Sequence, residues 1–360
     1  MKVLTVVGNR PQFIKAAAVS KRLREAHQEV LVHTGQHFDD DLSASFFSEL
    51  ELPAPDYELA VARGSNTSQT ARMLSGLEPV VRQIGPDAVL VYGDTNSTLA
   101  GALAGAQAGL AVAHVEAGMR SFDRSMPEEL NRVVADQLSA LLLCSSRTAV
   151  GNLEREHVSG AVELVGDVMM DVALTVQPRA GARRDMVTAR GLSPGEYLLI
   201  TAHRAGNVDD PVRLRRFVEL LAAIPRPGIL PLHPRTRARL QAAGLLERLA
   251  RTEHLHLTPP LGYFELTALL CNARAVVTDS GGLQKEAYLA GIPCVTLRAN
   301  TEWPETVERG WNVLVDLDRE AAVAALERRP PPERPPLYGD GHAGERVVAA
   351  LTLHLDHERP

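Results

Sequence analysis

Short apolar runs rich in Val, Ile and Leu alternate along the whole chain with longer amphipathic stretches. This alternation is typical of a parallel β-sheet covered by helices, because parallel strands need crossover connections. The sequence therefore predicts an α/β protein. The expected strands of the first half are Val3–Gly8, Val30–Gly35, Ala88–Asp94, Val112–Gly118, Leu141–Ser145 and Val162–Gly166. Those of the second half are Tyr197–His203, Gly228–His233, Leu255–Pro259, Ala275–Ser280, Cys294–Arg298 and Asn312–Asp316.

A polar, Arg-rich stretch from Asp167 to Gly195 separates the two sets of expected strands. The 360 residues leave room for two domains that each bury a core. We place the boundary near Asp167, with an N-terminal domain of residues 1–167 and a C-terminal domain of residues 168–342. The segment Arg328 to Pro336, RRPPPERPP, is expected to be an exposed, extended connector. The apolar-periodic helix 345–355 is expected to pack back on the N-terminal domain.

The charge balance makes nucleic acid an unexpected partner, because 38 Lys and Arg stand against 44 Asp and Glu, a formal charge of -6. No apolar run approaches the roughly 20 residues that span a bilayer, so no membrane association is expected. The first strand turns directly into Asn9-Arg10-Pro11 instead of a cleavage site, which predicts a cytoplasmic protein. The three cysteines, Cys144, Cys271 and Cys294, lack the spacing of zinc or redox sites and are expected to be buried bystanders.

Polar residues cluster where the expected strands end, and ligands of such sheets bind at the carboxyl ends of the strands. Arg10 and Lys15 follow the first strand and could hold a diphosphate with help from a helix N-terminus. The alternative is a pair of solvated charges at a domain rim. Gln36 and His37 follow the second strand, where His37 alone is weak support for a site.

Three carboxylates follow successive elements of the first half and are expected to converge on one sheet edge. Asp94 ends a strand, Glu116 lies inside an apolar strand where an ionised carboxylate is costly, and Glu128 starts a helix. Asp94 could instead simply cap the next helix. Burial and mutual repulsion would raise the pKa of at least one of the three, which suits a carboxyl that acts as acid or base.

The second half supplies strand-end histidines and a phosphate cradle. His203 and His233 each follow an apolar run, although a lone strand-end histidine is more often structural. The segment TDSGGLQKE around Ser280, Gly281 and Gly282 combines a strand, a glycine turn and a helix N-terminus, which is the geometry of a phosphate site. Glu286, one turn into that helix, could accept hydrogen bonds from ribose hydroxyls or be a solvated helix residue.

Several ordered motifs cover most of the chain: GNRPQFIKA, GQHF, VYGDTNSTLAGALA, HVEAGMRSF, MPEELNR, TAHR, LPLHPRT and VTDSGGLQKEA. Through them the sequence resembles the non-hydrolysing UDP-N-acetylglucosamine 2-epimerases. RPQFIKA, TNSTLAGALA and Thr301-Glu302-Trp303 look most like a branch that includes epimerases of UDP-2,3-diacetamido-2,3-dideoxyglucuronate. The resemblance implies two Rossmann-like parallel-sheet domains of glycosyltransferase-B type, with the active site in the interdomain cleft.

The resemblance also implies the reaction, which is anti elimination of UDP to a 2-acetamidoglucal and re-addition with C2 protonated from the opposite face. A C–H proton must be removed and a departing diphosphate stabilised. The residues that match the family's acid/base and active-site positions are Asp94, Glu116, Glu128, His203 and Lys15. Those expected to bind the UDP-sugar are Arg10, His37, His203, Ser280, Gly281, Gly282 and Glu286.

The resemblance implies no metal and no nicotinamide or other cofactor, a UDP-sugar as partner, a homodimer, and a place in polysaccharide biosynthesis. Some bacterial relatives bind a second UDP-N-acetylglucosamine as an activator. Gln36, Gln69, Arg204 and His233 lie in matching regions, but Gly206 and the Phe38-Asp39 segment count against such regulation. The alternatives are the same chemistry on UDP-2,3-diacetamido-2,3-dideoxyglucuronate, a hydrolysing epimerase, a sugar transferase and a catalytically silent nucleotide-sugar sensor. Three carboxylates count against a simple transferase.

Overall fold

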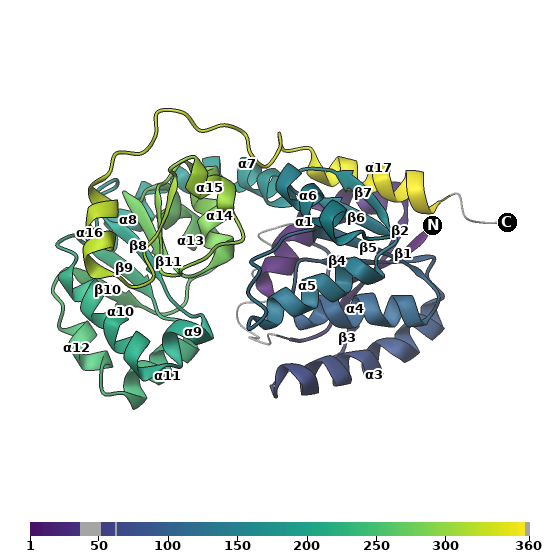
Figure 1. The fold of residues 1–360 in the computed structure, drawn as a ribbon, viewed down its shortest axis with the longest axis horizontal. Coiled ribbons are helices and arrows are strands. Elements are labelled where there is room, and N and C mark those ends of the chain that lie inside the picture. The colour runs from purple at the N-terminus through teal and green to yellow at the C-terminus, as the bar shows by residue number, and fades with distance from the viewer. Residues whose placement is uncertain (37–51, 62, 357–360) are drawn as a thin grey trace. The chain divides into compact units, whose positions relative to one another are not determined.

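The computed structural model describes residues 1–36, 52–61 and 63–356 and divides the chain into two compact units (Figure 1). Unit 1 comprises Met1–Val172 and the chain from Pro336 onward, and unit 2 comprises Ala173–Pro335. Each unit is a parallel sheet with helices in the crossover connections. The predicted fold class, two Rossmann-like units of glycosyltransferase-B type, is confirmed.

The sheet of unit 1 has the strand order β3-β2-β1-β4-β5-β6-β7, and every pair is parallel. Its strands are β1 (Lys2–Val7), β2 (Gln28–His33), β3 (Tyr57–Glu58), β4 (Ala88–Tyr92), β5 (Ala111–Ala117), β6 (Leu141–Cys144) and β7 (Ala161–Leu164). The helices within it are α1 (Arg10–Ala26), α3 (Asn66–Ile84), α4 (Asn96–Gln107), α5 (Pro127–Leu138), α6 (Arg147–Glu156) and α17 (Ala343–Leu355). The central strands read as unbroken apolar runs because helices bury both faces.

The sheet of unit 2 has the order β10-β9-β8-β11-β12-β13, again with parallel pairs. Its strands are β8 (Leu198–Thr201), β9 (Gly228–Pro231), β10 (Leu255–Thr258), β11 (Ala275–Thr278), β12 (Cys294–Thr296) and β13 (Asn312–Leu314). Its helices are α8 (Arg184–Thr188), α9 (Ala205–Val208), α10 (Pro211–Ala223), α11 (Pro234–Ala242), α12 (Leu246–Ala250), α13 (Tyr263–Cys271), α14 (Gly281–Ala290), α15 (Pro304–Glu308) and α16 (Arg319–Glu327).

Every strand expected from the sequence is present, whereas β3 was not expected. β3 has two residues, Tyr57 and Glu58, and neither is buried. A two-residue edge strand is too short to show an apolar pattern in the sequence. Its strand geometry comes from its pairing with β2 through Val32 and His33.

The division between the units falls inside helix α7 (Val168–Gly181), after Val172, and not at the predicted Asp167. In the first turn of α7, the side chains of Val168 and Met169 are buried. The sequence marks the point where a helix starts, but a packed helix can begin in one unit and end in the other. The second crossing lies at Pro335, before the predicted 342, because the backbone carbonyl of Tyr338 accepts a hydrogen bond from the Asp167 amide (2.9 Å) in unit 1.

Helix α17, yellow in Figure 1, packs on α1 within unit 1. Gly344 permits the close approach, because a Cβ there would collide with the backbone carbonyl of Ala18. The imidazole of His27 also meets the hydroxyl of Thr352 at 2.8 Å. Residues 329–336, part of the proline-rich segment, contain neither helix nor strand.

Candidate active site

The strand order reverses between β1 and β4 in unit 1 and between β8 and β11 in unit 2. Connections leave such a point in opposite directions, so a crevice forms beyond the carboxyl ends of the two strands, where ligands of these sheets bind. Lys15 lies in helix α1, which follows β1, and Asp94 lies in the loop after β4. In unit 2, His203 and Ser280 lie in the loops after β8 and β11. Each unit therefore presents its predicted residues at its own switch point.

The loop after β1 is held against the end of β4 by Gln12. The Gln12 side chain accepts from the Gly8 amide (2.8 Å) and donates to the Tyr92 carbonyl (2.8 Å) and the Thr98 hydroxyl (3.0 Å). Gly8 is required, because a Cβ there would collide with the hydroxyls of Ser97 and Thr34. Arg10 begins helix α1, and its contact with a diphosphate remains a prediction.

Glu116 lies on a β-bulge of β5. The pairing of β5 with β6 shifts between Val115 and Ala117, so Glu116 is the inserted residue of the bulge, and its φ is +72°. A non-glycine residue in the left-handed region is strained, and bulges of this kind redirect a side chain beside active sites. The Glu116 side chain, 4% exposed, forms an ion pair with the ammonium group of Lys15 from α1. The bulge thus turns a buried carboxylate toward a largely buried cation.

Asp94 lies next to this ion pair. A Cβ on the preceding residue, Gly93, would lie 3.0 Å from the Lys15 Nζ and 3.4 Å from the Glu116 Oε2. The Asp94 carboxylate, 25% exposed, pairs with the guanidinium of Arg132, and its backbone carbonyl accepts from Asn131 (3.0 Å). Asp94 does not cap α4, whose N-cap is Thr95. The structure therefore brings Lys15, Glu116 and the Gly93-Asp94 turn together.

Helix α5 organises this edge with charged residues that the sequence interpretation missed. Glu129, buried, accepts from the Ser121 amide (2.9 Å), the Phe122 amide (2.9 Å) and the Arg132 Nη1 (3.0 Å). Arg132 and Asp136 follow at helical spacing and are also buried. Glu128 lies half-buried in the first turn of the same helix. The missed signal was the spacing of three charged residues along one face of an amphipathic helix.

In unit 2 the buried carboxylate of Asp279 holds the loop after β8. It accepts from the backbone amides of His203 (3.1 Å) and Arg204 (3.0 Å) and from the side chain of Asn207 (3.1 Å). The His203 ring is 39% exposed, and its Nδ1 lies 3.8 Å from the Asp279 carboxylate. Asp279 therefore fixes the loop and leaves the His203 ring partly accessible.

The predicted phosphate cradle is present at the start of α14. Ser280 caps this helix, and its amide donates to the Thr278 hydroxyl (2.9 Å). No acidic residue occupies the first turn of the helix itself, and the positive end of a helix favours anions. The indole of Trp303 donates to the Gly281 carbonyl (2.9 Å), which fixes the turn. Gly282 is exposed, and Glu286 is half-buried one turn later.

A buried charge cluster lies beneath the cradle and was not expected from the sequence. Glu302 forms a bidentate pair with Arg298 (2.9 and 3.1 Å), and a guanidinium nitrogen of Arg204 lies 3.7 Å away. A Cβ on Gly281 would come within 3.1 Å of the Glu302 carboxylate. The ammonium of Lys285, also buried, lies 4.3 Å from the Trp303 ring centroid, a cation–π contact.

Of the residues matched to an activator site, Gln36 and Gln69 each bind a residue at the start of α4. Gln36 accepts from the Ser97 amide (3.1 Å) and hydroxyl (2.8 Å), and Gln69 accepts from Asn96 (2.9 Å). In unit 2 the His203 and His233 rings lie 5.5 Å apart. His37 and the Phe38-Asp39 segment fall outside the described residues.

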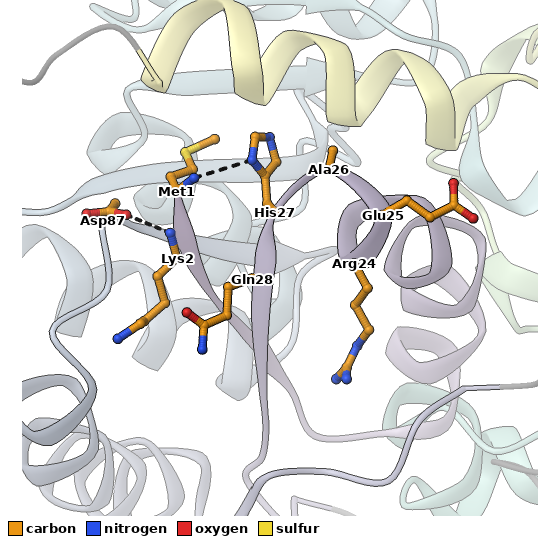
Figure 2. A pocket seen from close by; sticks show the side chains of 8 residues that line it. All are labelled: Met1, Lys2, Arg24, Glu25, Ala26, His27, Gln28 and Asp87. Atoms are coloured by element: carbon orange, nitrogen blue, oxygen red, sulfur yellow. Dashed lines mark hydrogen bonds between the residues drawn. The ribbon is translucent and has the colours of Figure 1, made fainter.

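A hollow lies at the other edge of the unit 1 sheet, where β1 and β2 begin (Figure 2). The Lys2 amide donates to Asp87 (2.6 Å), and the Met1 ammonium lies 3.5 Å from the His27 Nδ1. These groups bind one another at the amino ends of the strands, away from the switch point. We therefore do not assign the active site to this hollow.

The cysteines are poor nucleophiles. Burial raises the pKa of Cys144 and of Cys294 to about 12, and burial together with the charge of Glu286 raises that of Cys271 to about 11. Thiols with such values stay protonated near neutral pH. Within residues 1–36, 52–61 and 63–356, no group of three or more His, Cys, Asp or Glu could hold a metal ion. No helix in those ranges is long and apolar enough to cross a membrane.

The model of the family UDP-N-acetylglucosamine 2-epimerase matches residues 21–352. The chain belongs to this family. It is 45% identical to the UDP-2,3-diacetamido-2,3-dideoxy-D-glucuronate 2-epimerase of Pseudomonas aeruginosa, over 98% of this chain and 99% of the relative. It is 39% identical to the UDP-N-acetylglucosamine 2-epimerase of Methanocaldococcus jannaschii, over 98% of this chain and 99% of the relative.

A solved structure of this family agrees with the fold. The crystal structure of the Methanocaldococcus jannaschii enzyme in complex with UDP-GlcNAc and UDP superposes with a TM-score of 0.93 at 38% identity, covering 98% of this chain and all of that chain (100%). The predicted family and the resemblance to both kinds of 2-epimerase are therefore confirmed. The chain is an epimerase of nucleotide sugars.

Proposed function

We propose that the protein is a non-hydrolysing 2-epimerase that interconverts UDP-N-acetylglucosamine and UDP-N-acetylmannosamine. The observation that carries this proposal is the contact between Lys15 and Glu116 beside the Gly93-Asp94 turn. A carboxylate that must accept a weakly acidic C–H proton needs shielding from water and a fixed position, and the bulge at Glu116 gives both.

In the proposed reaction a carboxylate of unit 1 takes the C2 proton while the C1–O bond breaks and UDP leaves with the electron pair. The product of this step is a 2-acetamidoglucal. UDP then adds back to C1, and a second acid delivers a proton to C2 from the opposite face. Asp94, Glu116 and Glu128 are the proposed acid/base set, with Lys15 beside Glu116.

Unit 2 is the proposed binding site for the UDP portion. The amides at the start of α14, after Ser280, and the partly exposed ring of His203 suit a departing diphosphate. Electrostatic stabilisation of the leaving group lowers the barrier together with the base. Glu286 is the proposed partner of the ribose hydroxyls.

The test is proton NMR of UDP-N-acetylglucosamine incubated with the purified protein in heavy water. Deuterium at C2, appearance of UDP-N-acetylmannosamine and only traces of UDP are expected. Accumulation of UDP and free N-acetylmannosamine would instead identify a hydrolysing enzyme. An acceptor-dependent release of UDP without C2 exchange would identify a transferase.

A second candidate substrate is UDP-2,3-diacetamido-2,3-dideoxyglucuronate, favoured by the 45% identity to the Pseudomonas aeruginosa enzyme of that name. The same carboxylates would act on the same C2 proton, so the choice depends on groups that contact the C3 and C6 substituents. Parallel NMR incubations with both sugars give the kcat/KM ratio that decides between them.

A homodimer and a role in polysaccharide biosynthesis, which the resemblance implies, and a cytoplasmic location, which the N-terminal sequence predicts, remain predictions. Light scattering of the purified 39.0 kDa chain tests the first. The activator site at Gln36, Gln69, Arg204 and His233 is likewise a prediction, tested by whether UDP-N-acetylglucosamine accelerates the conversion of UDP-N-acetylmannosamine.

A further inference from the structure

One buried carboxylate binds the backbone and side chains on both sides of the Glu116 bulge. Asp136, on α5, is 0% exposed and accepts from the His114 Nδ1 (2.7 Å), the Gly118 amide (3.1 Å) and the Arg120 Nη1 (2.7 Å). His114 lies two residues before Glu116, and Gly118 lies two residues after it. Asp136 thus holds both ends of the bulge that directs Glu116.

His114, which binds Asp136 through Nδ1, also contacts the Gly93-Asp94 turn through its other ring nitrogen. Its Nε2 lies 2.6 Å from the carbonyl oxygen of Gly93, and the Gly93 amide donates to the Val115 carbonyl (3.0 Å). Gly93, the residue before Asp94, is therefore bound to β5 through both its N–H and its carbonyl. His114 therefore takes part in holding both Asp94 and Glu116.

The hydrogen bonds define the protonation of His114. A carbonyl oxygen only accepts, so Nε2 must carry a proton. Burial alone would raise the pKa of Asp136, but His114 and Arg120 outweigh it and hold that pKa below its usual range, so the carboxylate is ionised and Nδ1 also donates. His114 is fully buried, so its ring binds Asp136 and Gly93 and cannot touch a substrate.

We infer that His114 and Asp136 are positioning residues, which hold Asp94 and Glu116 at the fixed separation that proton transfer on the two faces of C2 requires. This inference rests on the proposed 2-epimerase function. A bulge with a non-glycine residue at positive φ persists only when its surroundings fix it. The pair supplies that restraint from within the core.

The test compares His114→Gln and Asp136→Asn with the wild type in the heavy-water NMR assay, together with calorimetric titration by UDP. We expect kcat to fall about 10- to 100-fold, since small misplacements of reacting groups cost up to about that much. The Kd for UDP and the fraction of protein that binds it should stay unchanged, because the proposed UDP site lies in unit 2.

Glu29→Gln is the matched control. Glu29 is a buried carboxylate of the same unit that accepts from Thr5 (2.7 Å), Ser20 and Arg24 (2.8 Å) and has no part in the proposed site. The Glu29→Gln substitution should lower the melting temperature by about as much as His114→Gln and Asp136→Asn do, and it should leave kcat unchanged. The positioning role would be overturned if His114→Gln and Asp136→Asn had the same kcat as Glu29→Gln. It would also be overturned if their kcat fell only in proportion to the fraction of protein that binds UDP.

A wild type without C2 exchange on either sugar would overturn the proposed function and, with it, this role, whereas an active wild type with fully active variants overturns the inference alone.

Discussion

Lys15 and Glu116 lie 101 positions apart in the chain, yet the ammonium group of one contacts the carboxylate of the other. Lys15 comes from the second turn of α1, and Glu116 from the bulge of β5. Both side chains are largely buried, at 13% and 4% exposed, so the pair interacts in surroundings of low dielectric constant. Predictions about catalysis start from this contact.

Replacing Glu116 by Gln keeps the shape of the side chain and removes its charge. We expect kcat to fall about 10²- to 10⁴-fold, the usual contribution of a general acid or base, with the Kd for UDP retained. Glu128→Gln should behave in the same way if Glu128 belongs to the acid/base set. Glu163→Gln, a substitution of a half-exposed carboxylate on β7, serves as the control and should keep full activity. Full activity in Glu116→Gln would reject the carboxylate assignment.

Gly93→Ala should damage the reaction more than the fold. Gly93 has φ +64°, and its added Cβ would approach the Lys15 Nζ to 3.0 Å. Gly109, with φ +72° and nothing within 4 Å of the added Cβ, is a matched site in the same unit. Both variants should lose about 1–2 kcal/mol of stability from backbone strain. Only Gly93→Ala should lose kcat, which a side-by-side measurement of activity and melting temperature decides.

Ser280→Ala should weaken UDP binding because it loosens the start of α14. Ser146 is the matched control, since it also caps a helix through its side chain, accepting from the Ala149 amide (3.2 Å). Each substitution should cost about 1 kcal/mol of stability. Calorimetry should detect a raised Kd for UDP in Ser280→Ala alone, and an unchanged Kd there would remove α14 from the proposed diphosphate site.

Stability should fall as the solution is acidified below about pH 6.5, the ordinary pKa of histidine. Burial, only partly offset by the charge of Glu58, lowers the pKa of His33. In that window the unfolded chain therefore binds more protons than the folded one, so the free energy of unfolding decreases as pH decreases. Melting temperatures of the wild type and of His33→Gln, measured on both sides of the window, should show the smaller pH dependence in the variant.

The sequence by itself determined the strands and the edge at which the chemistry gathers. Strands buried on both faces, such as β4, give continuous apolar runs, and the polar residues that end them, such as Asp94 and Ser280, mark the carboxyl edge. Parallel pairing brings those ends together whatever the detailed packing. The motifs around them were sufficient to indicate the family.

Only the tertiary structure decided how the carboxylates are held. The bulge at Glu116 depends on how β5 pairs with β6, and a pattern of period two cannot show one inserted residue. Arg132 and Asp136 of α5 are buried because their partners, Asp94 and His114, come from distant strands and loops. Long-range ion pairs compensate the cost of burying charge, and nothing local in the chain encodes them.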